Sequence, residues 1–300
     1  MRSTSLLCLA LVGVTPACGG TDSSSIAPDG AITGDSGNIT TAQAKLPAAT
    51  GTCPAIINGD VTFAPAGMPP RKVKLAFNEA AANDHGTLVI YWHATGSSPM
   101  EAAYSLGNGQ ATITGAGGII ATPYSDDTAG QFEWFIVNQS TKQDDFLLAD
   151  EIVACLHAAR RIDPAHIHSM GMSAGALQTT ALSFVRSNYI ASVATYSGGT
   201  PAGFNPSVQD PANKFAALIF AGGTADNVYG VDFKAASEAY QATLKRTGHL
   251  AALCNHGNGH KIPLDAAPSV VKFFAANAFG AWPSPYAAGL PAGFPSYCAL

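Results

Sequence analysis

A serine flanked by two glycines is the residue in this sequence best suited to covalent chemistry. Gly171 and Gly175 bracket Ser173 in the pattern Gly-x-Ser-x-Gly. An extended run from Pro164 precedes the serine, and an apolar run rich in helix-forming residues, 174–185, follows it. A serine on so sharp a strand-to-helix turn needs small neighbours, because other chain segments press close to it. The segment therefore predicts a nucleophile elbow; the alternative is a loop that carries the pattern by chance.

A serine hydroxyl is a weak nucleophile that needs a base beside it, and the base needs a carboxylate to orient it. Asp226 follows a predicted strand in a Gly-rich turn, and His260 follows the next predicted strand in a loop flanked by glycine. The order Ser, Asp, His along the chain is the one found in α/β-hydrolases. Two competitors are less well placed. Asp232 stands at the start of a predicted helix, where an acidic residue has an ordinary role, and His256 is the alternative base.

Backbone N–H groups must stabilise the oxyanion that develops during acyl transfer, and each donor is typically worth about 3 kcal/mol of barrier. The Ala174 amide comes directly after the proposed nucleophile. The second donor is expected in the loop after the predicted strand 88–93, and so from Ala94 or Thr95. We expect His93 to brace this loop by hydrogen bonding.

Four aromatic residues lie in a predicted loop after the short strand 117–123. Packing of a satellite core under the loop is the favoured account, and the functional alternative makes the loop a wall of the substrate cleft. On the functional account Trp134, Tyr124 and His93 contact the substrate. Truncating Trp134 would then weaken hydrolysis of a polymer while nearly sparing a small soluble ester. The four aromatic residues are Tyr124, Phe132, Trp134 and Phe135.

Strands and helices alternate along the 300 residues, and 47% of the residues are apolar. This pattern predicts one α/β domain, a mostly parallel central sheet with helices on both faces. Charged residues are only 12% of the chain, the net charge is -5, and no basic cluster exceeds residues 71–74, so a nucleic-acid surface is excluded. Besides the elbow strand, strands are expected at 61–63, 72–77, 86–93, 117–123, 190–196, 215–221 and 250–254, and helices at 144–156, 174–185, 233–246 and 270–279.

The first 18 residues have the features of an export signal: a positive residue, a short apolar run and a small-residue cleavage site. Cys18 directly follows that site and resembles a lipobox cysteine, which would make it a lipidated N-terminus; ordinary cleavage is the alternative. Residues 19–50 are predicted to be a flexible tether, and residues 51–300 a single catalytic domain. We expect an exported monomer, either secreted or held at the cell envelope by that lipid as its one membrane contact.

Four cysteines lie beyond the signal. An even number in an exported chain predicts two disulfides, and four cysteines allow three pairings. We favour Cys53 with Cys155 and Cys254 with Cys298.

No metal or other cofactor is expected. No C-x-x-C spacing occurs among the cysteines. His166 and His168 share one face of the elbow strand, but no carboxylate or third histidine accompanies them at ligand spacing. Packed, hydrogen-bonded histidines are therefore the preferred interpretation.

Several short motifs occur together in the order seen in a known enzyme family. They are the helix start 144–146, the Arg-Ile-Asp-Pro run 161–164, the elbow 171–176, the Gly-Thr-Ala-Asp turn 223–226 and the Gly-x-Gly-His run 257–260. Over roughly residues 50 to 280 the chain resembles the polyhydroxybutyrate depolymerase and feruloyl esterase group of secreted α/β-hydrolases. It departs from the family where His93-Ala94-Thr95-Gly96 replaces the usual His-Gly pair.

The resemblance implies a serine esterase that hydrolyses a polymeric or aromatic ester, a polyester or a plant-wall ester, through an acyl-enzyme. On this hypothesis Ser173 is the nucleophile, His260 the base and Asp226 the orienting carboxylate. The alternative is a surface lipoprotein that uses a hydrolase-like fold to bind glycan or polymer. A pure binder has no need of all three residues, which favours the enzyme.

Overall fold

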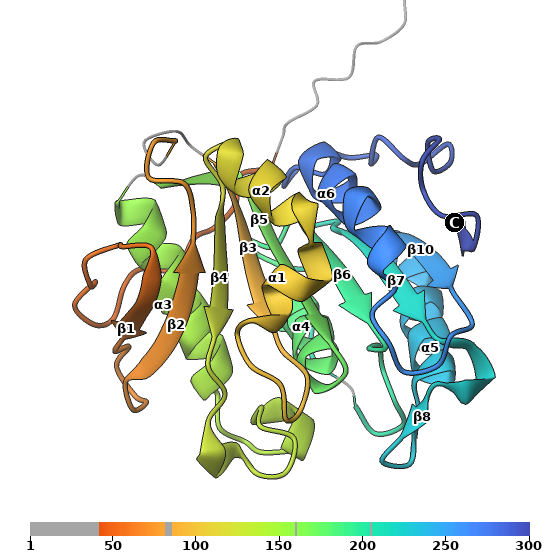
Figure 1. Ribbon diagram of the computed structural model, residues 1–300, viewed down its shortest axis with the longest axis horizontal. Helices are drawn as coiled ribbons and strands as arrows, with labels where there is room; N and C mark the ends of the chain where they lie inside the picture. The colour runs from red at the N-terminus through yellow and green to blue at the C-terminus, as the bar shows by residue number, and fades with distance from the viewer. Residues whose placement is uncertain (1–41, 82–85, 160, 205) are drawn as a thin grey trace, which may run out of the picture. The chain divides into compact units, whose positions relative to one another are not determined.

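A nine-stranded sheet forms the centre of the computed structural model, which describes residues 42–81, 86–159, 161–204 and 206–300 (Figure 1). Its strand order is β1-β2-β4-β3-β5-β6-β7-β10-β11. The strands are β1 (Gly59–Phe63), β2 (Arg71–Ala76), β3 (Gly86–Trp92), β4 (Ile119–Pro123), β5 (Ile162–Met172), β6 (Ser192–Tyr196), β7 (Ala216–Ala221), β10 (Leu250–Asn255) and β11 (Cys298–Ala299). The helices are α1 (Glu101–Leu106), α2 (Asn108–Gly115), α3 (Asp144–Ala158), α4 (Ala174–Val185), α5 (Phe233–Arg246) and α6 (Ala267–Ala276).

The six strands from β4 to β10 in the sheet run parallel, and antiparallel strands flank them. β1 and β2 form an antiparallel edge at one side of the sheet, and β11 pairs antiparallel with β10 at the other edge. Parallel strands put their carboxyl ends on one side of a sheet, which is the lower side in Figure 1. The predicted fold class is confirmed.

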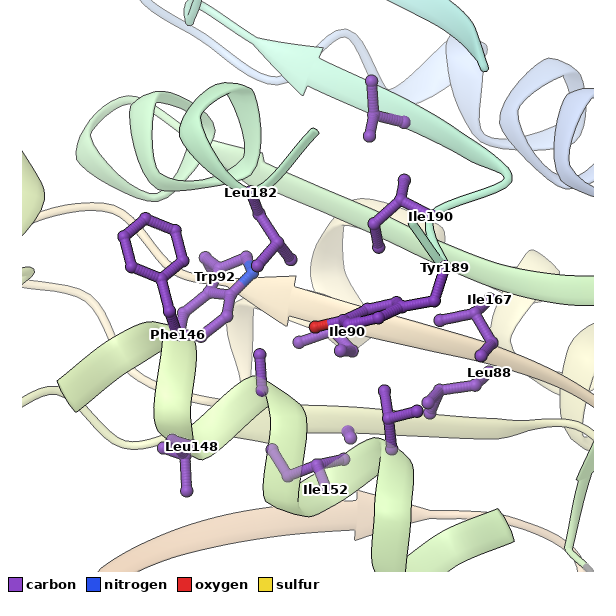
Figure 2. Close-up of a cluster of buried hydrophobic side chains, with 14 of the residues drawn as sticks. Leu88, Ile90, Trp92, Phe146, Leu148, Ile152, Ile167, Leu182, Tyr189 and Ile190 are labelled. Carbon is purple, nitrogen blue, oxygen red and sulfur yellow. The ribbon is translucent and has the colours of Figure 1, made fainter. Parts of the chain in front are cut away.

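Helices cover both faces of the sheet. α1, α2 and α6 lie in front of it in Figure 1, and α3, α4 and α5 pack on the other face. Side chains of a strand alternate between the two faces, so Leu88, Ile90 and Trp92 of β3 all point to the face covered by α3, α4 and α5. Figure 2 shows these three side chains with Phe146 of α3 and Leu182 of α4. A strand buried on both faces reads as a continuous apolar run, which explains why β3 was predictable.

The elements absent from the sequence prediction are short. α1 has six residues and α2 has eight, and glycines at 107, 109 and 115 interrupt any helical periodicity there. β11 and the hairpin strands β8 (Asn227–Val228) and β9 (Val231–Asp232) have two residues each. Alternation cannot be recognised in two residues.

Residues 42–50 were expected within the flexible tether but lie against the domain. The Lys45 N–H group donates to the Asn188 carbonyl at 2.9 Å, and the Asn188 side chain donates back to the Lys45 carbonyl at 2.8 Å. Leu46 packs against the core. The domain therefore includes residues before 51. The expected signal, Cys18 and the tether up to residue 41 lie outside the described residues.

Two disulfides connect segments near the two ends of the described chain to helix α3 and to strand β10. Cys53 bonds to Cys155 of α3 across 102 residues of sequence, and Cys254 of β10 bonds to Cys298 of β11 across 44. This is the pairing favoured above. Within the described ranges, every helix is too short or too polar to span a bilayer.

The buried His249, directly before β10, is hydrogen-bonded to Phe215, directly before β7. The Phe215 N–H group donates to Nδ1 of His249 at 3.2 Å, and the two rings lie 4.3 Å apart. Burial, with the nearby positive charge of Lys214, lowers the pKa of His249 to about 4. The ordinary imidazole pKa is about 6.5, so the neutral ring stabilises the fold above that pH. This stabilisation is lost as the pH falls from about 6.5 toward 4.

We expect the free energy of unfolding to fall by about 2–3 kcal/mol between pH 7 and pH 4.5 through His249 alone. His249→Gln keeps an acceptor for the Phe215 N–H group but does not titrate, so it should lose correspondingly less. Urea unfolding of both proteins at the two pH values measures the difference. Other titrating groups cancel because both proteins carry them, and parallel losses would contradict the role of His249.

Candidate active site

The turn between β5 and α4 holds Ser173 in a strained conformation. Its φ of 56° and ψ of -120° lie outside the regions that ordinary residues prefer. Gly171 and Gly175 make the turn possible, because a Cβ atom on either one would overlap the Trp92 carbonyl group at the end of β3. The sharp strand-to-helix turn expected from sequence is therefore the local structure at Ser173.

The structure brings Ser173, His260 and Asp226 into one hydrogen-bonded chain. His260 Nε2 lies 2.8 Å from Ser173 Oγ, and His260 Nδ1 lies 2.7 Å from Asp226 Oδ1. A carboxylate can only accept, so Nδ1 carries the proton and Nε2 is left to accept from the serine hydroxyl. All three residues follow carboxyl ends of parallel strands, which is why they meet although 87 positions separate Ser173 from His260.

Asp226 is fully buried and is held as an anion. Burial by itself would raise its pKa, but the hydrogen bonds from His260, from the Gly222 N–H group and from the Ser197 hydroxyl outweigh burial and lower the pKa of Asp226. Asp226 Oδ2 accepts from Ser197 Oγ at 2.9 Å and from Gly222 N at 2.8 Å. Sequence analysis did not identify Ser197; its position directly after β6, before two glycines, was the available signal.

The two competing residues have other partners. The Asp232 carboxylate caps α5 by accepting from the Ala235 N–H group at 2.9 Å. His256 Nδ1 accepts from the Asn258 N–H group at 3.2 Å, and burial lowers the pKa of His256. These contacts leave His260 as the histidine that meets Ser173.

One of the expected oxyanion donors is occupied. The Ala94 N–H group donates to Glu101 Oε1 at 3.0 Å, so it does not face the serine, and this part of the prediction is wrong. Thr95 lines a cavity together with Ser173 and Ala174. Ala174 begins α4, where backbone N–H groups have no partner within the helix. Thr95 and Ala174 are therefore the remaining candidate donors.

The loop around Thr95 is held by side chains on both sides. Glu133 Oε2 accepts from the Gly96 N–H group at 3.1 Å, and the Trp134 indole donates to the His93 carbonyl at 2.9 Å. His93 Nδ1 lies 2.9 Å from the Ala94 carbonyl, which is the bracing contact expected of it. Neither Glu133 nor Glu101 was identified from sequence, because each is a loop partner in three dimensions with no motif around it.

A cavity of about 190 Å³ opens beside Ser173. Among the described residues that line it none is charged, and its polar groups besides the serine are the side chains of Thr95 and Gln139 and the Tyr229 hydroxyl. The bulkier apolar and aromatic members of its wall are Phe132, Val137, Leu177, Phe204, Tyr229 and Phe233.

The side chains expected to bind substrate do not line this cavity. Trp134 is fully buried, packed edge-on against Trp92 at 5.1 Å, and His93 is 1% exposed. The Tyr124 hydroxyl donates to Asp60, and Lys72 lies over its ring, at the β1–β2 edge. Of the four aromatic residues in this loop, Phe132 is the one in the cavity wall. The packing interpretation therefore holds for Trp134, whose indole N–H group donates to the buried His93 carbonyl.

Backbone strain is concentrated at this site. Among the described residues, five that are not glycine have positive φ. Such conformations persist where the surrounding structure enforces them, and they cluster at functional sites. One is the proposed nucleophile, two line the cavity, and two hold Asp226 or the loop around Thr95. They are Ser173, Gln139, Tyr229, Ser197 and Glu133.

The candidate metal ligands are engaged with other groups. Within the described ranges, one cluster has ligand spacing, Cys53, Glu151 and Cys155; its two sulfurs form a disulfide, and its carboxylate accepts from the Gly51 N–H group. His166 Nδ1 lies 2.8 Å from Asp163, and His168 Nδ1 lies 2.8 Å from Ser192 Oγ. Hydrogen bonds account for both histidines as expected from sequence, but the expectation that no carboxylate accompanies them is wrong at His166, whose partner is Asp163.

Similarity to known proteins lies in the fold. No family model matches the chain, and no curated protein matches it either. The crystal structure of native pOPH aligns with a TM-score of 0.63 at 14% identity, covering 82% of this chain and 95% of that one. A CE1 ferulic acid esterase from Anaeromyces mucronatus aligns with a TM-score of 0.52 at 16% identity, covering 75% and 90%. Esterase PE8 aligns with a TM-score of 0.51 at 19% identity, covering 67% and 96%.

These alignments, together with the parallel sheet, confirm that the chain has the α/β-hydrolase fold. This is the fold that the motif resemblance implied. The elbow after β5, the acid after β7 and the histidine after β10 occupy the strand ends at which that fold collects its chemistry.

We expect Trp134→Ala to lower the free energy of unfolding by about 3–5 kcal/mol, because it removes a fully buried ring. Phe132→Ala, at the partly exposed cavity wall, should lower it much less. Urea denaturation of both variants measures the contrast. Hydrolysis of a polymer and of a small soluble ester should fall together in Trp134→Ala. A selective loss on the polymer would instead restore a substrate contact for Trp134.

Proposed function

We propose that this protein is a serine carboxylic-ester hydrolase. The observation that carries the proposal is the chain of hydrogen bonds from Asp226 through His260 to Ser173 Oγ, at 2.7 and 2.8 Å. His260 Nε2 takes the serine proton as Oγ attacks the ester carbonyl carbon, and the imidazolium is stabilised by the buried Asp226 carboxylate. The same proton then passes to the leaving alcohol.

The acyl-enzyme on Ser173 is next hydrolysed by water, with His260 acting as base again. Two backbone N–H groups, those of Ala174 and Thr95, would stabilise the negative carbonyl oxygen in both steps. Their residues share the cavity with the serine, which supports this assignment. No metal or other cofactor is required by this sequence of steps.

The cavity supports an uncharged substrate. None of the described residues in its wall is charged, and about 190 Å³ suits an aromatic ring or a short aliphatic chain. Polyhydroxybutyrate and a feruloylated polysaccharide are the two substrates that the motif resemblance suggests. Parallel measurement of released 3-hydroxybutyrate and ferulate distinguishes them, and release of neither by active enzyme would exclude both.

We also propose that the protein works outside the cytoplasm. Two disulfides form and persist in oxidising compartments, which supports export. The export signal 1–18, the lipid on Cys18 and a monomeric state remain predictions.

Replacement of the nucleophile tests the proposal most directly. Ser173→Ala should reduce kcat on p-nitrophenyl esters on the order of 10⁵- to 10⁶-fold, since it removes the attacking oxygen. A fluorophosphonate probe should label the unmodified protein at Ser173 and leave the variant unlabelled.

Paired histidine variants give the matched control. His260→Ala should lose activity on the same scale, and His256→Ala should lose far less, since His256 meets an amide of its own loop and not Ser173. Full activity in Ser173→Ala would end the proposal. Failure of the probe to label folded protein would favour a binding protein with a vestigial site.

A further inference from the structure

The hairpin β8–β9 carries a bulky residue where its turn favours a small one. Tyr229 and Gly230 are the two residues between Val228 and Val231, which pair across the hairpin, and their φ values are 53° and 78°. Positive φ at both positions is the requirement of a type I′ turn, for which Asn-Gly is the preferred pair. Tyrosine at the first position strains the backbone, because its Cβ atom disfavours left-handed conformations.

Burial does not compensate for this strain. Tyr229 is 65% exposed, so its ring contributes little to the core. Its ring lies edge-on to Phe132 at 5.6 Å, and both residues line the cavity beside Ser173. A residue that is both largely exposed and part of a cavity wall stands at the mouth of that cavity. Strained residues cluster at active sites and ligand clamps, and an exposed aromatic ring supplies contact area for a ligand.

The base of the hairpin is fixed by the site itself. β8 begins directly after Asp226, and β9 leads into α5, whose Phe233 ring packs on His260 at 4.7 Å. The hairpin lies at the carboxyl-end side of the sheet in Figure 1. Tyr229 is therefore held at a defined place relative to the reacting groups and not on a free loop.

We propose that Tyr229 is a specificity-determining residue which, with Phe132, clamps an uncharged aromatic ring of the ester at the cavity mouth. This rests on the proposed ester hydrolysis. The cavity of about 190 Å³ slightly exceeds the roughly 150 Å³ of an engineered cavity that admits benzene. Within the part of the chain that the structure describes, its lining offers no charged side chain that would favour a carboxylate or ammonium group on the ring. Rings meet Tyr and Phe favourably in edge-on or offset contact.

The variant Tyr229→Asn separates binding from structure, because asparagine suits the turn better than tyrosine does. We expect its melting temperature to equal or exceed that of the unmodified protein. Its kcat/KM ratio for ring-bearing over ring-free esters should fall about three- to tenfold, mostly through KM. Tyr229→Phe keeps the ring and should keep the ratio. Tyr104→Asn is the matched control, since Tyr104 is 61% exposed on α1 and does not line the cavity.

Three esters locate the ring. Vinyl acetate has none, p-nitrophenyl acetate has one in the alcohol, and vinyl benzoate has one in the acid. A drop relative to vinyl acetate for one of the two ring-bearing esters supports the clamp and shows which half of the ester it holds. Unchanged ratios in Tyr229→Asn, or a lower melting temperature with equal losses on all three esters, would overturn the proposal.

A binding measurement separates this proposal from the proposed activity. Methyl benzoate should bind Ser173→Ala about three- to tenfold more tightly than it binds Ser173→Ala/Tyr229→Asn in calorimetric titration. Equal affinities, or no binding to either protein, would overturn the clamp whatever the activity. If the unmodified protein hydrolyses none of the three esters and resists the fluorophosphonate probe, the proposed activity fails, while a difference in methyl benzoate affinity would still support the clamp.

Discussion

Backbone contact between β3 and the elbow is the constraint on which the site depends. The Trp92 carbonyl group at the end of β3 occupies the space that a side chain at Gly171 or Gly175 would need. Because β3 lies next to β5 in the sheet, the loop after β3 passes directly beside the turn that carries Ser173. Strand order and the lack of side chains at Gly171 and Gly175 therefore bring Thr95 of this loop and Ser173 to the same cavity.

Carboxylates stabilise the loops that this contact brings together. Glu101 and Glu133 accept from the amides of Ala94 and Gly96, on either side of Thr95, and Asp226 accepts from the amide of Gly222. Hydrogen bonds to an ionised acceptor are roughly twice as strong as those between neutral groups. In a chain with only 12% charged residues, these three acids hold loop backbone beside the site. Thr95 therefore lies between two anchored amides, and none of the described residues that line the cavity carries a negative charge.

The serine, aspartate and histidine could be predicted from sequence because a topological rule places them: residues that follow parallel strands meet at one edge of the sheet. Partners within loops obey no such rule. The Ala94 amide was an expected donor, but it faces Glu101, which lies on a six-residue helix that shows no readable periodicity. A tryptophan such as Trp134 occurs in the walls of clefts and in packed cores alike, so the residue type alone did not decide between them. Its burial depended on the His93 carbonyl being within reach of the indole, which no spacing along the chain encodes.

The strained backbone positions indicate which residues of the site are explained by their contacts and not by a contribution to the stability of the fold. A positive φ is unfavourable for Ser173, Ser197 and Tyr229 alike, and each directly follows a strand, β5, β6 or β8. The central sheet holds the backbone in the unfavourable conformation at the two serines, and the separate two-stranded hairpin β8–β9 does so at Tyr229. For the two serines the strain accompanies the hydrogen bonds of the triad. For Tyr229 no such bond exists among those described, and the ring pair with Phe132 at the cavity is what the strained backbone sustains. Because neither burial nor a hydrogen bond described here offsets this strain, the contact with Phe132 at the cavity is the interaction that accounts for the side chain.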